Sequence, residues 1–234
     1  MATQPEPTLE YRARLSRRRV LHAAVALADR DGIDSLTMRN LAHELDVEAM
    51  SLYYHVANKE AVLDGIVEVV AEEILAAIDQ LDLPAGGDDW RGSMRPMILA
   101  ARQVLLAHPW APAVIETRTA MCPPIIRHFE AVLGVFLGAG FSYDLAHHAM
   151  HALGSRALGF NQELFAPDSV GNDGDETMEM MEQMAAELPN LVGMMMAISH
   201  DDPDSTLGWC DDQSEFEFGL DLILDGLELL RSRH

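Results

Sequence analysis

Cysteines and long apolar runs are scarce in this chain of 234 residues, and each scarcity excludes a class of protein. Cys122 and Cys210 are isolated thiols without C-x-x-C spacing, too few for the disulfide scaffold of a small secreted domain. No apolar run reaches the roughly 18 to 20 residues that cross a bilayer, and the N-terminus lacks the apolar segment of a signal peptide. We therefore expect a cytoplasmic protein with reduced cysteines and no membrane contact.

Basic residues are also few, since the net charge is −22 and Lys59 is the only lysine. Such an acidic excess, taken alone, argues against a nucleic-acid partner. The charge is uneven, however. Residues 1–60 hold eight basic and nine acidic groups, with five arginines between residues 12 and 19, whereas residues 61–234 hold eight basic and twenty-nine acidic groups. This pattern predicts a near-neutral head with a basic edge, able to dock on phosphate, and an acidic body.

Helical patterns are present throughout, and 49% of the residues are hydrophobic, enough for a substantial core. A first helix is predicted from a cap at Ser16 to a stop at Gly32, and a second from a cap at Thr37 to about Leu45. A short connection then leads to a third helix over residues 50–55. This spacing fits a helix-turn-helix, although similar helical corners also occur in proteins that never touch DNA.

The stretch GIDSLTMRNLAHELDVEAMSLYYHVANKEAVLDGI, residues 32–66, resembles the DNA-binding head of the TetR family of bacterial transcription regulators. Three later segments are similar to the ligand-binding body of the tetracycline repressors: DDWRGSMRPMILAARQVLLAHP, GAGFSYDLAHHAMHALGSRALGF and FEFGLDLILDGLELL. The resemblance implies a ligand-responsive regulator, usually a repressor, that binds a palindromic double-stranded DNA operator as a dimer. A small-molecule effector would release it.

The expected fold is all-α, because no window has the β-branched alternation of a sheet. We expect a flexible arm over residues 1–15, a three-helix helix-turn-helix domain over 16–62 and a helical ligand-binding and dimerisation domain over 63–234. The helices predicted beyond the head cover residues 58–82, 90–108, 112–121, 123–138, 143–165, 176–187 and 214–232, with a shorter one near 189–199.

The resemblance also implies which side chains meet DNA. Leu52 turns inward, while hydroxyl groups on the exposed side of the third helix can reach phosphates or base edges. Asp46 stands where the family commonly has a glycine, and the contribution of the arginines at 12–19 stays open. The expected DNA contacts are Thr37, Arg39, Ala49, Met50, Ser51, Tyr53, Tyr54, His55 and Lys59.

The ligand site is expected in the body, where methionine is abundant. Methionine adapts to irregular ligands but is also ordinary core filler. Glu116 or a neighbour stands where the tetracycline subfamily has a magnesium-binding histidine, although Glu163 falls near that subfamily's water-linked acidic residue. We therefore expect a different small apolar or aromatic effector and no cofactor. The expected ligand contacts are Met94, Met97, Ala101, Glu116, Met121, Met150 and Glu163.

The helices at 143–165 and 214–232 are expected, by the resemblance, to pair two copies into a dimer. His147 and His151 lie four residues apart on the first of them, yet packing or hydrogen bonding explains them better than a metal, and no metal is predicted. Two alternatives remain. One is a DNA-binding regulator without a ligand, and the other is a helical enzyme that binds small molecules. We expect no catalytic residue, because no nucleophile–base spacing or phosphate loop is present.

Overall fold

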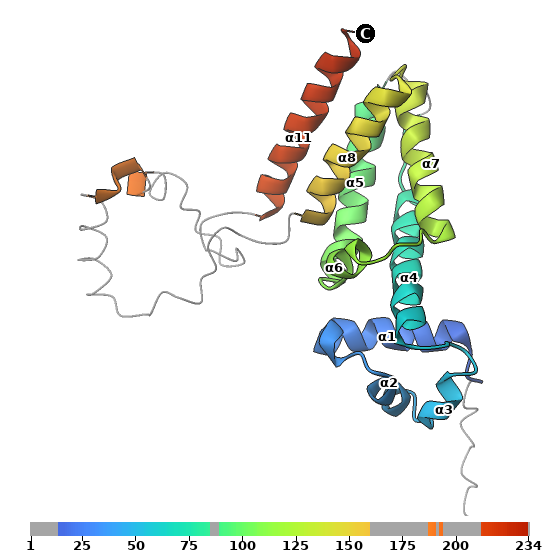
Figure 1. The fold of residues 1–234 in the computed structure, drawn as a ribbon. Helices are drawn as coiled ribbons and strands as arrows, with labels where there is room; N and C mark the ends of the chain where they lie inside the picture. Colours follow the sequence, from blue (N-terminus) through green and yellow to red (C-terminus); the bar gives the residue numbers. More distant parts are fainter. Residues whose placement is uncertain (1–13, 85–88, 160–186, 191, 194–211, 234) are drawn as a thin grey trace, which may run out of the picture. The chain divides into compact units, whose positions relative to one another are not determined.

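The computed structural model describes residues 14–84, 89–159, 187–190, 192–193 and 212–233. Within these ranges the regular structure is entirely helical (Figure 1), which confirms the expected all-α fold. None of the helices described is long and apolar enough to span a bilayer. In chain order the elements are α1 (Arg17–Asp31), η1 (Ile33–Ser35), α2 (Met38–Glu44), α3 (Ala49–Leu52), α4 (Lys59–Asp79), α5 (Trp90–Ala107), α6 (Ala111–Glu116), α7 (Pro123–Gly138), α8 (Tyr143–Gly159) and α11 (Asp212–Arg231).

By mutual contact the residues form two compact units. The first comprises Met1–Gln80 and Gln103–His128, and the second comprises Leu81–Arg102 and Phe129–His234. The first unit is therefore larger than a three-helix head, because it also contains α4 and α6.

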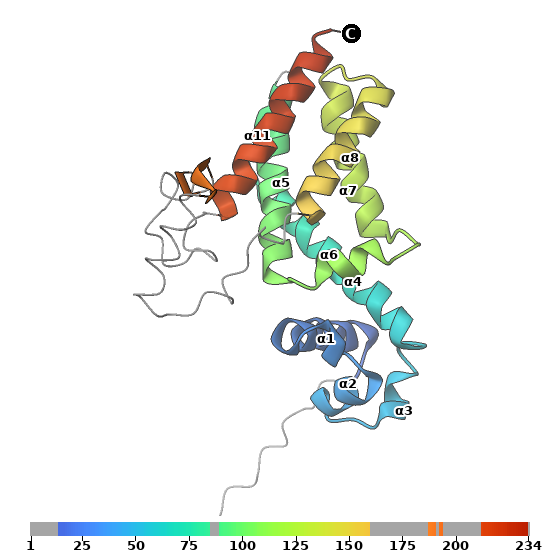
Figure 2. The ribbon, with the colours of Figure 1, turned by 60° about the vertical axis from the view of Figure 1, so that its left-hand side comes forward.

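In the first unit, α1 packs on α4, and α2 and α3 complete the head (Figures 1 and 2). The Ser16 hydroxyl caps α1 by accepting the N–H of Arg19 at 3.3 Å. Gly32 ends the helix with a φ of 79°, a conformation that favours glycine. The apolar stripe of α1, including Val20, Ala24 and Leu27, is buried. The predicted first helix and both of its ends are confirmed.

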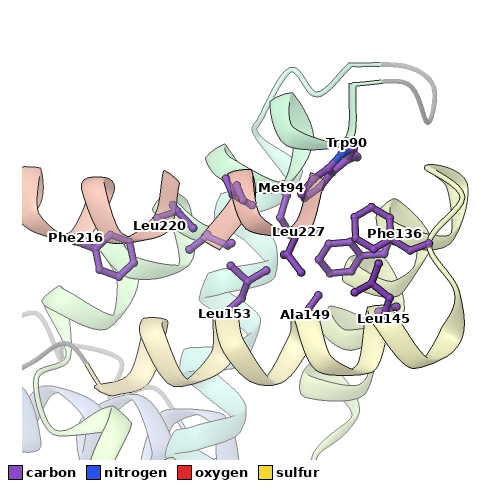
Figure 3. Close-up of a cluster of buried hydrophobic side chains, with 13 residues drawn as sticks. Trp90, Met94, Phe136, Leu145, Ala149, Leu153, Phe216, Leu220 and Leu227 are labelled. Atoms are coloured by element: carbon purple, nitrogen blue, oxygen red, sulfur yellow. The ribbon is translucent and has the colours of Figure 1, made fainter. Parts of the chain in front are cut away.

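The second unit has a core of apolar side chains from α5, α7, α8 and α11 (Figure 3). Trp90 is at its aromatic centre, with its ring centroid 4.9 Å from that of Phe141 and 5.7 Å from that of Phe136. The indole N–H of Trp90 donates to Glu228 at 2.7 Å, which satisfies its polar atom. The buried α11 residues of this core are Phe216, Leu220, Leu224 and Leu227.

Arginines on α5 meet a row of carboxylates on α11 beside this core. Arg95 contacts Asp221 at 2.8 Å and Glu217 at 2.6 Å, and Arg91 contacts Asp225 at 2.6 Å. The hydrogen bonds that Arg95 donates to Asp221 and then to Glu217 raise its pKa above the ordinary value. These ion pairs fix the register of α11 against α5.

Three helix ends differ from the sequence prediction, and one of them is the end of α4, which lies at Asp79 rather than at residue 82. The third helix ends at Leu52 rather than His55, because the N–H groups of His55 and Val56 both turn back to the carbonyl of Leu52. The helix predicted over 112–121 ends at Glu116, where the Thr117 hydroxyl donates to the carbonyl of Val114 at 2.7 Å. Residues 160–165 of the helix predicted over 143–165, and most of the helices predicted at 176–187 and 189–199, lie outside the described residues.

Candidate nucleic-acid interface

The corner between α2 and α3 is a compact helix-turn-helix. The Thr37 hydroxyl caps α2 by accepting the N–H of Asn40 at 3.1 Å. In the turn, Asp46 has a φ of 51°, the left-handed conformation expected for the residue that replaces the family's glycine. The N–H of Val47 donates to the carbonyl of Ala42 at 3.0 Å, so the chain reverses and α3 starts at Ala49.

The short helix α3 has one buried and one exposed side. Leu52 is 0% exposed, whereas Met50 is 69% exposed and Tyr54, just beyond the helix, is 88% exposed. Side chains as exposed as these contribute little to the core, so the stability of the fold does not explain why a methionine and a tyrosine stand here. Ala49 and Tyr53 are also exposed, and Ser51 and His55 are half-buried. The structure therefore places all six predicted residues at one end of the first unit, around α3.

The flanking predicted contacts are exposed as well. Arg39 lies in the first turn of α2, next to the capping residue Thr37. Lys59 is the first residue of α4, after Asn58, whose side chain accepts the N–H of Ala61 at 2.8 Å. A cation beside free N–H groups at a helix start favours a phosphate.

Arg17 and Arg30, both on α1, form ion pairs with carboxylates. Arg30 binds Glu44 of α2 at 2.9 Å and the adjacent Asp31 at 3.0 Å, and these bonds raise its pKa. Arg17 binds Glu68 of α4 at 2.8 Å. Near the start of α1, an open hollow of about 520 Å³ is lined by Ser16, Arg18, Arg19, His22, Ala23 and Leu45.

A polar cluster that the sequence did not predict lies elsewhere in the same unit. His108 follows α5, and its two ring nitrogens lie 2.8 Å from Asp29 and 2.9 Å from Glu73. The indole N–H of Trp110 donates to the same Asp29 oxygen at 2.6 Å. The contributing residues are up to 81 positions apart in the sequence, so no local spacing indicates the cluster.

A second set of ion pairs joins the segment after α6 to the start of α4. Arg118 donates to Glu60 at 2.8 Å and to Asp64 at 3.3 Å. The hydrogen bond that Arg118 donates to Glu60 is the main reason that the pKa of Arg118 is raised. This arginine was also missed by sequence reasoning.

The predicted ligand contacts are distributed over both units. Met94 is 0% exposed within the core of the second unit, and Met150 packs against the same core. Met97 and Ala101 are buried on α5. In the first unit, Glu116 and Met121 are exposed to solvent. Glu163 lies outside the described residues.

The helices predicted to pair two copies, α8 and α11, lie side by side in the second unit (Figures 1 and 2). On α11, Phe218 is 65% exposed, and Leu222 and Leu229 are also exposed. On α8, the rings of His147 and His151 are exposed, with centroids 4.6 Å apart. Within the described part of the chain, no group of three or more His, Cys, Asp or Glu side chains is arranged to hold a metal.

Comparison with protein families decides what this corner belongs to. A model described as bacterial regulatory proteins of the tetR family matches residues 20–66, which contain every predicted DNA contact. A model described as the C-terminal domain of tetracyclin repressor-like proteins matches residues 83–231, more than half of the chain. The chain belongs to the TetR family.

TetR-family relatives match nearly the whole length. An HTH-type transcriptional regulator of Saccharopolyspora erythraea is 30% identical over 230 residues, covering 96% of this chain and 89% of the relative. The class D tetracycline repressor protein of Escherichia coli is 31% identical over 222 residues, covering 93% and 91%. Among solved structures, the Streptomyces coelicolor TetR family protein ActR in complex with (S)-DNPA matches with a TM-score of 0.67 and 26% identity, covering 92% of this chain and 98% of that one. This chain is thus a transcription regulator with a helix-turn-helix DNA-binding domain.

Proposed function

We propose that this TetR-family regulator is a repressor that binds a palindromic operator as a homodimer and is released by a small apolar or aromatic effector. The observation that carries the DNA part is the exposure of Met50 and Tyr54 on the helix whose Leu52 is fully buried. In a helix-turn-helix, the exposed side chains of the second helix enter the major groove. There an apolar side chain can contact a thymine methyl, and a hydroxyl can reach a base edge or a phosphate.

The predicted phosphate contacts flank that row. Arg39 and Thr37 lie at the start of α2, and Lys59 lies at the start of α4. Phosphate contacts fix the register of a DNA-binding domain on the duplex without reading sequence. We call the helix-turn-helix formed by α2 and α3 the DNA reader. The proposal therefore assigns base reading to α3 and positioning to the two flanking helix starts.

Dimerisation is supported by exposed apolar side chains on α11, which packs beside α8. Phe218, Leu222 and Leu229 keep apolar surface in water in the single chain, and burying it against a second copy is favourable. A single reader covers too few base pairs for a specific site, whereas two readers about 34–36 Å apart read both halves of a palindrome.

The effector part has weaker support from the buried methionines. Met94 and Met97 in the second unit are flexible side chains that can repack around a ligand. Relatives named for tetracycline and a relative solved with (S)-DNPA make a small molecule a reasonable effector class. Glu116 or a neighbour stands where the tetracycline subfamily has a magnesium-binding histidine, which argues against tetracycline itself.

One observation favours the alternative of a regulator without a ligand. Met94 is fully buried in contact with the aromatic core, a position that ordinary core packing explains. If none of a set of small apolar and aromatic compounds releases the protein from DNA, this alternative replaces the effector proposal.

A gel-shift series with DNA flanking the protein's own gene tests the proposal. We expect wild type to shift a palindromic fragment and Tyr54→Ala to weaken the binding by about 1–3 kcal/mol. Tyr54→Phe separates the hydroxyl from the ring. Leu106→Ala, at an exposed apolar residue of α5 outside the reader, is the control and should bind as wild type. Failure of wild type to bind any such fragment would refute the operator proposal.

A further inference from the structure

His108 is held in a geometry that requires a proton. Its side chain is 9% exposed, and its Nδ1 and Nε2 atoms lie 2.8 Å from a carboxylate oxygen of Asp29 and 2.9 Å from one of Glu73. A neutral imidazole has one N–H and one lone pair, so it can donate to only one of these acceptors. The imidazolium form donates to both. In the neutral form, one carboxylate would face the ring's lone pair at hydrogen-bond distance.

The cluster joins three segments of the first unit. Asp29 lies in the last turn of α1, Glu73 lies on α4, and His108 and Trp110 lie in the connection between α5 and α6. The Trp110 indole donates to the Asp29 oxygen that also faces His108. Asp29 falls within the matched DNA-binding region and His108 within the matched C-terminal region. The Asp29 carboxylate is therefore one of the contacts between the two family regions, in addition to the ion pairs of Arg118 with Glu60 and Asp64.

The charges around the ring determine the direction of its titration. Burial lowers the pKa of His108, but hydrogen bonds with Asp29 and Glu73, together with their charges, outweigh burial and raise it above the ordinary value of 6.5. The charged groups facing the ring are Asp29 from α1 and Glu73 from α4, and the Trp110 indole is uncharged. Because the pKa is raised, the stabilisation that the protonated ring gives to this cluster is complete at low pH. It is lost as the pH rises through the raised pKa.

We propose that His108 is a proton-operated clamp on the DNA reader: its protonated ring holds the end of α1 to α4 and to the α5–α6 connection, and losing the proton loosens this hold and weakens operator binding. The inference rests on the proposed operator binding. α1 packs against α2, which in turn packs against α3, so a loosened α1 must be ordered again when the protein binds DNA. That ordering costs affinity.

Two substitutions separate the charge of His108 from its shape. His108→Gln keeps a polar side chain but has no titratable charge, and His108→Arg keeps a permanent charge that can pair with both carboxylates. Operator affinity is measured for wild type and both variants from about pH 5.5 to about pH 9, a span that brackets histidine titration. Circular dichroism at each pH verifies that the variants are folded.

The variants are compared with wild type at each pH, so that any pH dependence of operator affinity shared by all three proteins cancels. We expect His108→Gln to bind on the order of tenfold more weakly than wild type at low pH, the usual size of such coupling, and equally at high pH. His108→Arg should bind more tightly than wild type at high pH. If the ratio of the operator affinity of His108→Gln to that of wild type is the same at every pH, His108 has a purely structural role and the proposal is overturned.

A second measurement does not depend on any variant binding DNA. The imidazole carbon signals of histidine-labelled wild type are titrated by NMR, and the His108 signal is assigned from its absence in the Gln variant. We expect His108 to titrate above the ordinary histidine range, and titration below that range would overturn the proposal. If wild type binds no operator at any pH, the proposed function fails, while this titration still reports whether the ring holds its proton.

Discussion

Gly65 of α4 faces Leu21 of α1 so closely that a Cβ atom placed on Gly65 would overlap the leucine side chain. Leu21 is itself buried, so it has little room to move away. The absence of a side chain at residue 65 is therefore what allows α1 to lie directly on α4. Because α1 and α2 pack together, this contact also supports the DNA reader.

Replacing Gly65 with alanine should destabilise the protein despite the better helix propensity of alanine. Overpacking a buried contact of this kind costs about 1–3 kcal/mol. The control is Gly134→Ala on α7, where an added Cβ meets nothing within 4 Å, and it should be neutral or stabilising by up to about 1 kcal/mol. Urea unfolding of both variants measures the effect, and equal stability of the two would contradict the close contact.

The turn of the helix-turn-helix should prefer glycine to alanine at residue 46. Asp46 has a φ of 51°, where a Cβ atom costs about 1–2 kcal/mol. Asp46→Gly and Asp46→Ala both remove the carboxylate, so their difference in stability isolates the backbone contribution. We expect the glycine variant to be more stable by about 1 kcal/mol, reduced somewhat by the greater freedom of glycine in the unfolded chain. An alanine variant of equal or greater stability would mean that the turn has another conformation.

The carboxylate of Glu228 should make the second unit sensitive to acid. Hydrogen bonds from Arg231 and then Trp90 lower its pKa below the ordinary value of 4.5. Its stabilisation is therefore complete above about pH 4.5 and is lost as the pH falls through the lowered value. Since the side chain is 35% exposed, we expect at most about 1 kcal/mol.

Glu228→Gln tests this expectation, because it removes the charge but keeps an oxygen for the Trp90 indole. The free energy of unfolding is measured in urea near pH 7 and near pH 3.5, the second of which lies below the ordinary carboxyl value. Other carboxylates titrate in the same range, so the relevant quantity is the difference between wild type and variant. That difference should shrink in acid, and a difference that grows would reverse the sign argued here.

Lys59 should contribute to operator binding through a phosphate rather than a base. Lys59→Gln is expected to weaken binding to all sequences by a similar factor and to reduce the slope of log affinity against log salt by about one per reader. Arg127→Gln removes an exposed cation from α7, outside the reader, and is the matched control. A change in sequence preference without a change in slope would assign Lys59 to base reading instead.

Local patterns in the sequence predicted much of the head. Ser16, Thr37 and Gly32 mark helix ends because capping depends on a few neighbouring residues, and the structure confirms all three. The family resemblance, rather than a local pattern, implied that Leu52 is buried and that Met50 and Tyr54 are exposed, and the structure agrees. The last residues of α3 and α6 were predicted less well. The last residue of a short helix depends on whether its backbone N–H groups form turn bonds or continue the helix. The composition of these segments is compatible with either outcome.

The sequence alone therefore determined the helical class, which follows from spacing within about twenty residues. Through its resemblance to a known family it also indicated the helix-turn-helix and the exposed side chains of α3. Only the tertiary structure revealed the contact of Gly65 with Leu21, the pairing of Arg118 with Glu60 and the enclosure of His108 by Asp29 and Glu73. These contacts join residues 35 to 79 positions apart in the sequence, and the packing of the helices decides which residues meet. Hydrophobic periodicity determines which face of a helix is buried, but the partner of a buried charge depends on how the helices are packed together.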